Sequence, residues 1–438
     1  MISDTDGASL INQIQAGTKL TVDFPTDGPS APIPNPSVGG KMSTFSSWGP
    51  TWEAHSKPDI SAPGGNIYAT YPLAQGGHAV LSGTSMAAPY IAGLAALYIG
   101  KAGGRRRLGP GGILELKRRI QASGNLIEWN DGVDTDPTRL APIAQQGAGY
   151  VNGLKIFYDT VITPGKLELN DTANFKPGHF VNVKNTGKKT VLYTVSHQAA
   201  GTVLSFRDPA ENPLPFPPTF VDGSASAKFS VQKLSVRPGT TNSFKVTFTP
   251  PKSLDPKQLP LYSGQIVLTG DNGETLSIPY QGILGSRFNV DIWRPEDSEP
   301  YYASDETGDL IFGKHTWSMQ EFDRPAAVFF NRFGTEEMRW DVVETGWQER
   351  HAKYPAVEGK NKFVGSVVDA YDGNRFPEKY LTRVDPLASY YFYYAWNGEL
   401  TNGTSKLFPG TREFVYRLLT ALQRSLRGRI SLCGGSCG

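Results

Sequence analysis

One short stretch, residues 81–89 (LSGTSMAAP), limits what this chain can fold into more than any other, because it joins a strand to a helix at a serine. Residues 78–81 have the character of a strand. Beyond Ser85, apolar residues recur at helical spacing, namely Ala87, Tyr90, Ile91, Leu94, Ala95, Leu97 and Tyr98. Ser85 is therefore expected to open a buried helix, whose first N–H groups carry partial positive charge and suit a developing oxyanion. Pro89 fits the first turn of such a helix, where a missing N–H breaks no helical bond.

The same stretch carries a family resemblance. Gly83-Thr84-Ser85-Met86-Ala87-Ala88-Pro89 resembles the nucleophile motif of the subtilisin-like serine proteases, the subtilases. Residues 45–50 (FSSWGP) and 57–64 (KPDISAPG) look like the two segments that precede this motif in the family, and residues 145–152 look like the element that closes its catalytic domain. The resemblance implies that Ser85 attacks a peptide carbonyl while its own N–H helps to hold the oxyanion, with Gly83, Thr84, Met86 and Pro89 supporting the motif. The alternative is a serine that merely caps a core helix.

A serine hydroxyl is a weak nucleophile unless a histidine takes its proton and a carboxylate orients that histidine. The family's His-Gly-Thr and Asp-Thr-Gly settings do not occur before Ser85. We expect His78 to be a packing or surface histidine and His55 to be a polar loop residue. The resemblance therefore places the Asp and His of the triad outside this sequence.

Two other candidates for missing parts of the site fail the same comparison. Asp4-Thr5-Asp6-Gly7 is expected to be a turn before a helix over residues 8–16, since no hydrophobic strand precedes it. Neither Asn12 nor Asn35 matches the family's oxyanion asparagine. Because a general base contributes about 10² to 10⁴ in rate and an oxyanion donor about 10² to 10³, the chain alone is expected to be a poor or inactive hydrolase.

The chain is expected to contain part of an α/β catalytic domain with a parallel sheet, followed by two all-β, sandwich-like domains. Hairpin signals at Asn185-Thr186-Gly187 and Asp271-Asn272-Gly273, with alternating apolar residues around them, favour the first sandwich, which is similar to the fibronectin-type-III-like domain of large subtilases. The expected divisions are residues 1–40 (remnant of a protease-associated insert and linker, with a strand over 18–24), 41–161 (C-terminal part of the catalytic domain), 162–285 (first sandwich), 286–425 (second β-rich domain) and 426–438 (irregular tail).

Composition excludes several other classes of function. A net charge of +2, from 43 basic and 41 acidic side chains, argues against a nucleic-acid partner. A membrane-spanning helix is not expected, because the sequence contains no apolar run of about 18 residues. The two cysteines, Cys433 and Cys437, lie together at the end of the chain, leave their pairing open and make a poor zinc site. No cofactor or metal is expected. The sequons at Asn170 and Asn402 agree with secretion, although the first residues do not read as a signal peptide.

Three further expectations concern single features. Asp59 is expected to bond local backbone rather than hold calcium, which prefers about six to eight oxygen ligands. The basic run Arg105-Arg106-Arg107 is expected to be a solvated loop before a helix over residues 113–121. The aromatic run over residues 390–396 is expected to be sandwich core, with a carbohydrate platform as the alternative.

Two hypotheses follow from the sequence. The first is a serine endopeptidase, or its C-terminal part, that acts on polypeptides once a separate N-terminal fragment supplies the missing triad residues. The second is a noncatalytic secreted protein whose β-domains bind protein or glycan. If strands of the central sheet are supplied by another segment, residues 41–152 should also expose apolar surface that is normally covered.

Overall fold

The structure is a computed structural model, and it describes most of the chain. The described residues are 4–21, 39–51, 53–132, 136–207, 214, 217–287, 290, 301–311, 317–329, 334–344, 346–351, 353, 355–381, 392–403, 412–419 and 426–430. The chain divides into two units, residues 1–39 and 40–438. Within the described ranges, no helix combines the length and the apolar character that a membrane crossing requires.

The first unit contains one helix, α1 (Asp4–Gln15), in its described part. The expected turn at residues 4–7 is wrong, because these residues already form the first turn of α1. Residues 18–21 are not a strand, and the remainder of the strand expected over 18–24 lies outside the described residues.

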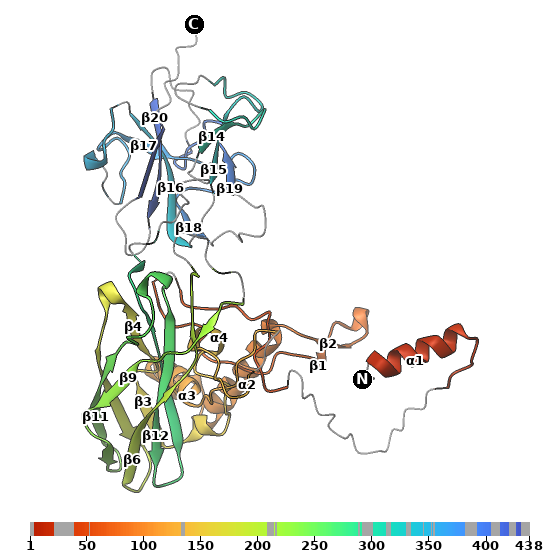
Figure 1. Cartoon of the computed structure of the whole chain (residues 1–438), viewed down its shortest axis with the longest axis vertical. Coiled ribbons are helices and arrows are strands. Elements are labelled where there is room, and N and C mark those ends of the chain that lie inside the picture. Colours follow the sequence, from red (N-terminus) through yellow and green to blue (C-terminus); the bar gives the residue numbers. More distant parts are fainter. Residues whose placement is uncertain are drawn as a thin grey trace. The chain divides into compact units, whose positions relative to one another are not determined.

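The second unit begins with a small helical part (Figure 1). Its helices and strands are β1 (Ile67–Thr70), η1 (Leu73–Gln75), β2 (His78–Leu81), α2 (Thr84–Lys101), α3 (Arg105–Ala122), α4 (Ile143–Gln146) and η2 (Lys155–Phe157). Strands β1 and β2 form an antiparallel hairpin. The expected parallel sheet is not confirmed, since the parallel pairing within the described part of residues 39–157 is one isolated bridge, Ser61 to Tyr150. The local strand-to-helix junction at Ser85 is as the sequence predicts.

Two helix predictions need correction. Helix α2 is not buried, because none of its residues reaches full burial. It packs one face against α3, where Leu116 and Ile120 contact Leu94 and Tyr98 in a small cluster. Arg105–Arg107 are not a loop, since α3 begins at Arg105 and kinks at Gly109, whose φ of 66° lies in the left-handed region.

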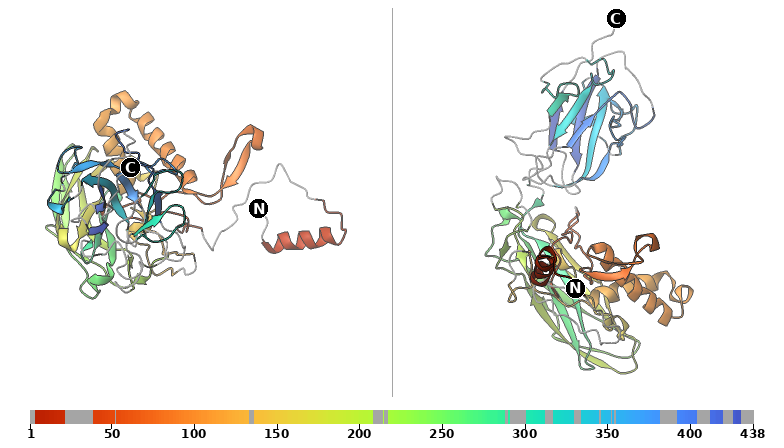
Figure 2. Two further views of the ribbon diagram at one scale, coloured as in Figure 1. Left: turned by 90° about the horizontal axis from the view of Figure 1, so that it is seen from above. Right: turned by 90° about the vertical axis from the view of Figure 1, so that its right-hand side faces the viewer.

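A β-sandwich follows (Figures 1 and 2). Its strands are β3 (Thr160–Thr163), β4 (Leu167–Asp171), β5 (Gly178–Asn185), β6 (Val191–Ala199), β7 (Thr202–Val203), β8 (Phe220–Val221), β9 (Ser226–Phe229), β10 (Lys233–Val236), β11 (Thr241–Thr249), β12 (Leu261–Gly270) and β13 (Thr275–Ile283), with short 3-10 turns η3 (Thr172–Asn174) and η4 (Pro256–Gln258) between them. In the described part, one sheet has the order β10-β6-β12-β13-β4, with β7 and β8 beside β12, and the other has the order β3-β5-β11-β9. Only β13 and β4 are parallel among these pairs.

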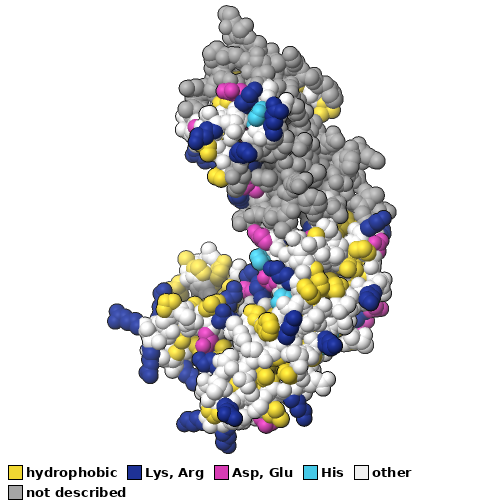
Figure 3. Space-filling view, turned by 90° about the vertical axis from the view of Figure 1, so that its left-hand side faces the viewer, with side chains coloured by type: hydrophobic (Ala, Val, Ile, Leu, Met, Phe, Trp, Pro, Cys, Tyr) yellow, Lys and Arg dark blue, Asp and Glu magenta, His cyan; other side chains and the backbone are white. Residues whose placement is uncertain are grey.

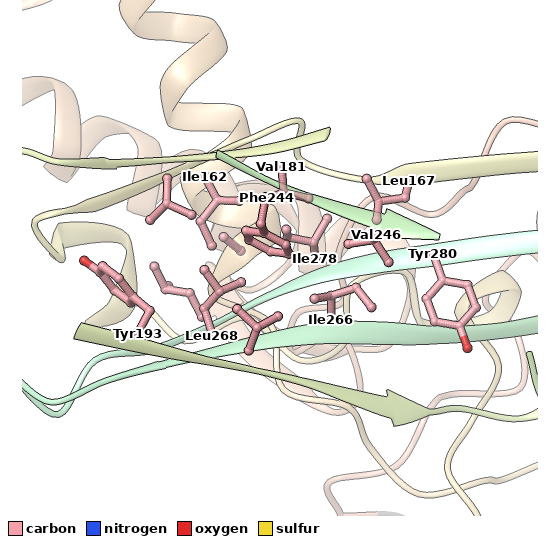
Figure 4. Close-up of a cluster of buried hydrophobic side chains, with 14 of the residues drawn as sticks. Ile162, Leu167, Val181, Tyr193, Phe244, Val246, Ile266, Leu268, Ile278 and Tyr280 are labelled. Atoms are coloured by element: carbon pink, nitrogen blue, oxygen red, sulfur yellow. The ribbon is translucent and has the colours of Figure 1, made fainter. Parts of the chain in front are cut away.

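The sandwich core lies between the two sheets (Figure 4). Strand β11 shows why it forms: Phe244, Val246 and Phe248 alternate with polar residues and are 0–2% exposed. They meet Ile266, Tyr280 and further buried residues from the opposite sheet. The period-two pattern therefore predicts the buried face correctly.

Strand pairing was predicted less well. The hairpin at Asp271-Asn272-Gly273 is confirmed, with Gly273 at φ 85° joining β12 to β13. Asn185-Thr186-Gly187 does not form a hairpin, because β5 pairs with β3 and β11 while β6 pairs with β10 and β12 in the other sheet. Phe229 ends β9 and residues 233–236 form β10, so the alternating apolar run over 229–236 is divided between different sheets.

The second β-rich part contains β14 (Tyr301–Ser304), β15 (Pro325–Phe329), β16 (Thr335–Glu344), η6 (Glu349–His351), β17 (Phe363–Ser366), β18 (Glu378–Leu381), β19 (Phe392–Ala395), β20 (Arg412–Leu419) and β21 (Leu426–Ile430). Its described sheets have the orders β14-β15-β19 and β17-β16-β20-β21, with β18 beside β16. Tyr394 and Trp396 belong to its buried cluster, as the core interpretation of the aromatic run predicts, while residues 390 and 391 lie outside the described residues. The tail is not wholly irregular, since β21 pairs with β20. Cys433 and Cys437 lie outside the described residues.

The helical part and the sandwich share a buried cluster. Trp129 and Ala144 of the helical part pack against Phe206, Leu261 and Ile283 of the sandwich. Polar bonds cross the same interface, because the Ser277 hydroxyl donates to the Gly124 carbonyl at 3.1 Å. The two parts are therefore packed together rather than joined by a loose linker.

Candidate active site around Ser85

Ser85 is the second residue of α2, after the N-cap Gly83 and the first helical residue Thr84. Its side chain is exposed. At this position the backbone N–H has no intrahelical carbonyl to bond, so it remains free to donate to an incoming oxygen. The first turn of α2 contains no acidic residue that would oppose negative charge there. The turn is thus suited to a serine oxygen and a developing oxyanion.

Pro89 has a different role from the expected one. Because α2 begins at Thr84, Pro89 is inside the helix rather than in its first turn. A residue at this position normally donates its N–H to the carbonyl four residues earlier, which is that of Ser85. Proline has no N–H, so the Ser85 carbonyl lacks that helical bond. The effect of Pro89 is thus on the carbonyl of Ser85 and not on its N–H.

The loop before the hairpin supports the serine turn. The Gly83 N–H donates to the Gly64 carbonyl at 2.8 Å. A Cβ placed on Gly64 would lie 2.8 Å from the Gly83 oxygen and 3.3 Å from Ala87 Cβ, which explains why glycine is needed there. The Asn66 N–H also donates to the Ser82 hydroxyl at 2.8 Å. The segment that ends at Asn66 therefore holds both residues that precede the helix.

Neither upstream histidine bonds Ser85. His78 stacks on Tyr68 at 5.4 Å between ring centroids, at the end of the hairpin far from Leu81. His55 lies in a loop, and its Nδ1 is 2.7 Å from Glu168 Oε2 of strand β4. Within the described ranges, the Ser85 hydroxyl has no hydrogen-bond partner, so the structure brings no general base to it.

Asp59 is held by cations rather than by local backbone, which corrects the sequence expectation. Its carboxylate lies 2.6 Å from Lys57 Nζ, 3.3 Å from Lys117 Nζ and 3.7 Å from Lys166 Nζ, and Gln121 Nε2 donates to it at 2.9 Å. Burial by itself raises the pKa of Asp59, but the lysines outweigh it, so the pKa is lowered from its ordinary 3.8. In the described part of the chain, no group of three or more His, Cys, Asp or Glu side chains is arranged to hold a metal ion.

Comparisons with known proteins agree with the geometry. The profile of the subtilase family matches residues 9–107, and that of the Fn3-like domain matches residues 167–281. The PIII-type proteinase of Lactococcus lactis subsp. cremoris (strain SK11) is 28% identical over 322 residues, which cover 65% of this chain and 15% of that protein. Residues 9–107 are thus similar to the subtilase family.

Two further similar proteins are known. The minor extracellular protease Vpr of Bacillus subtilis (strain 168) is 28% identical over 55% of this chain and 28% of its own length. The C5a peptidase of Streptococcus pyogenes serotype M6 (strain ATCC BAA-946 / MGAS10394) is 34% identical over 35% of this chain and 12% of its own length. The chain thus spans less than a third of each of these relatives. Peptidase chemistry is common to the names of all three.

Several apolar side chains of the helical part are exposed, as expected for residues 41–152. Tyr90 and Leu97 of α2 are 43% and 64% exposed, and Leu73 at the tip of the β1–β2 hairpin is 92% exposed. Further exposed apolar residues lie on the same part of the chain, namely Tyr68, Tyr71, Val80, Leu81, Ile113 and Leu114. Exposed apolar patches of this kind are typical of surfaces that contact another molecule.

Residues that sequence reasoning missed lie on the sandwich side. Glu168 of β4 and Lys166, the residue just before β4, bond the loop at residues 55–59. Nothing in the local sequence marks them, because their partners are more than a hundred positions away. Gly64 ends the segment KPDISAPG, but its closeness to Gly83 is visible only in three dimensions.

Proposed function

We propose that this chain provides the nucleophile of a serine endopeptidase that hydrolyses peptide bonds in polypeptides. The observation that carries the proposal is the exposed Ser85 at the N-terminus of α2, in the family's nucleophile motif and next to the loop that ends at Gly64. The Ser85 oxygen attacks the carbonyl carbon of the substrate, its proton passes to a general base, and the Ser85 N–H donates to the resulting oxyanion. The remaining sites around Ser85 (Gly83, Thr84, Met86 and Pro89) shape the turn.

The general base and its orienting carboxylate come from another polypeptide segment. This part of the proposal is supported by the positions of the two upstream histidines. His55 is bonded to Glu168, and His78 is stacked on Tyr68. It is also supported by the open face of α2, because such a segment would bury Tyr90 and Leu97 when it docks. The chain by itself is then a weak hydrolase.

The place of action is outside the cell. The support comes from the relative named as a minor extracellular protease, which matches 55% of this chain.

Reaction with a fluorophosphonate probe tests the nucleophile. We expect slow labelling that mass spectrometry assigns to Ser85, that Ser85→Ala abolishes, and that added imidazole accelerates because it replaces the missing base. Ser82, exposed three residues earlier, is a matched internal control because its adduct would appear in the same peptide. The variant His78→Ala, whose ring stacks on Tyr68, should label at the wild-type rate.

Two results would reject the proposal. If imidazole accelerates labelling of Ser82 and Ser85 equally, the turn gives Ser85 no nucleophilic advantage. If Ser85 takes no probe with imidazole present, the binding role of the β-domains is the better description of the chain.

A further inference from the structure

Strand β4, the first strand of the Fn3-like domain, is bonded to residues 55 and 56 of the loop that leads to the serine turn. The Ser56 N–H donates to Glu168 Oε1 at 3.2 Å, and Lys166 Nζ donates to the Ser56 carbonyl at 2.8 Å. Lys166 and Glu168 also bond each other at 3.0 Å, so both polar groups of one backbone residue are held by an ion pair. Ser56 is 2% exposed, which makes these bonds costly to lose. We call Lys166 and Glu168 the β4 clamp.

The β4 clamp belongs to a larger network of charges. Glu168 Oε2 is 2.7 Å from His55 Nδ1, and Lys166 Nζ is 3.7 Å from Asp59. Asp59 in turn bonds Gln121 of α3. On one face of the molecule, acidic, basic and histidine side chains lie close together (Figure 3). The network therefore fixes residues 55–59 from two sides, by β4 and by α3.

The held loop runs directly to the serine turn. Ser61 pairs with the closing segment through the Ser61 N–H to Gly149 carbonyl bond of 2.9 Å and the Val151 N–H to Ser61 carbonyl bond of 2.9 Å. Three residues later the Gly64 carbonyl accepts the Gly83 N–H, and the two residues pack so closely that a Cβ on Gly64 would lie 2.8 Å from the Gly83 oxygen. Because short, bonded loops transmit displacement to the groups they contact, a shift at Ser56 reaches the N-cap of α2.

We propose that Lys166 and Glu168 of the Fn3-like domain are positioning residues for the Ser85 turn, so that this domain is part of the catalytic apparatus and not a spacer. The inference rests on the proposed function of Ser85. Neither residue contacts the serine, and both act through residues 55–64. The expected consequence is that the N-terminus of α2 loosens when the clamp is broken, while the sandwich stays folded.

The test uses a thiol as a reporter in place of the serine. In the full chain, Cys433→Ser and Cys437→Ser remove the existing cysteines, and Ser85→Cys introduces one at the helix N-terminus. A helix N-terminus lowers the pKa of a thiol, so the pH profile of its alkylation by iodoacetamide measures how well the turn is formed. Amide exchange in residues 79–90 gives a second readout that needs no chemistry at the serine.

Glu168→Gln and Lys166→Gln should each move the alkylation profile to higher pH and speed exchange in residues 79–90 by about tenfold, the effect of losing a charge-assisted bond. Lys166→Arg keeps the charge and donors, and should restore the wild-type profile. Glu274→Gln is the matched control, because Glu274 bonds the Asp159 N–H on the same domain without touching residues 55–64.

The outcomes separate this inference from the nucleophile assignment. Unchanged alkylation and exchange in both clamp variants would overturn it, even if the probe labels Ser85. Equal acceleration in Glu274→Gln, or in the β12–β13 peptides, would also overturn it, because the effect would then be general destabilisation. A shifted profile without probe labelling would support the clamp and reject only the nucleophile. If Glu168→Gln does not fold, Lys166→Gln against Lys166→Arg carries the same comparison.

Discussion

Gly64→Ala is the sharpest test of how the serine turn is held, because Gly65 next to it offers a matched control. An alanine Cβ at position 64 would lie 2.8 Å from the Gly83 oxygen, whereas ordinary contacts begin at 3.4 Å, so two backbones must separate by about half an ångström. At position 65 the nearest atom to a new Cβ is Ser43 Oγ at 3.7 Å, which needs no adjustment.

Overpacking of this kind costs about 1–3 kcal/mol, and a backbone neighbour cannot relieve it by changing rotamer. The displaced Gly83 also carries the carbonyl that accepts the Met86 N–H at 3.0 Å, so the first turn of α2 should open more often. The gain from a stiffer unfolded chain, about 0.4–1 kcal/mol for a glycine-to-alanine change, applies to both variants and cancels in the comparison.

The assay is amide exchange in residues 79–90, since a chain of several domains has no single midpoint of unfolding. We expect exchange to be about 5-fold to 150-fold faster in Gly64→Ala and close to wild type in Gly65→Ala. Equal rates in the two variants would refute the idea that the Gly64–Gly83 contact sets the turn.

Three other perturbations have defined outcomes. Ile266→Ala, at a position that is 0% exposed, should destabilise the sandwich by about 2–4 kcal/mol in urea, and a change under about 1 kcal/mol would contradict the core assignment. Leu97→Gln, at 64% exposure, should change the free energy of unfolding by less than about 0.5 kcal/mol. It should also reduce the binding of a hydrophobic dye to the chain. Unchanged dye binding would mean that α2 is not the open apolar surface. Burial raises the pKa of Glu168, but Lys166 and His55 outweigh it and hold the pKa below 4.5, so its stabilisation is present above that value and lost as pH falls through the lower, folded-state pKa. The acid sensitivity of exchange in residues 79–90, corrected for the intrinsic rate, should therefore be smaller in Glu168→Gln than in wild type, and identical acid profiles would contradict the pairing.

Local sequence patterns predicted the elements around the serine well. The junction of β2 and α2 follows from a strand-like run, a glycine and an apolar helical repeat, all within about twenty residues. The turn at Gly273 and the buried face of β11 were equally local, since one depends on φ at a glycine and the other on a period of two.

Features that depend on distant partners were not predictable in the same way. Asn185 does make turn bonds, accepting the Gly187 N–H and donating to the Lys189 carbonyl, yet its amide also reaches the Val236 carbonyl across the fold. The strands on either side therefore join different sheets despite a hairpin signal. Asp59 was expected to bond nearby backbone, but three of its four partners are lysines, two of them brought in from α3 and from the position just before β4.

The burial of α2 was predicted wrongly for a related reason. Its composition is that of an interior helix, and one face does pack on α3. The other face meets no surface within the described part of this chain. The composition of a helix shows that it has an apolar face to bury, but it does not identify the polypeptide that buries that face.

The cluster that unites Trp129 and Ala144 with Phe206, Leu261 and Ile283 limits how this protein can be taken apart. A cut between residues 161 and 162 would leave each product with half of a hydrophobic core facing water. Engineers who graft the Fn3-like module onto another protease, or remove it to shorten this one, should therefore carry the residues on both sides of that seam as a single cassette.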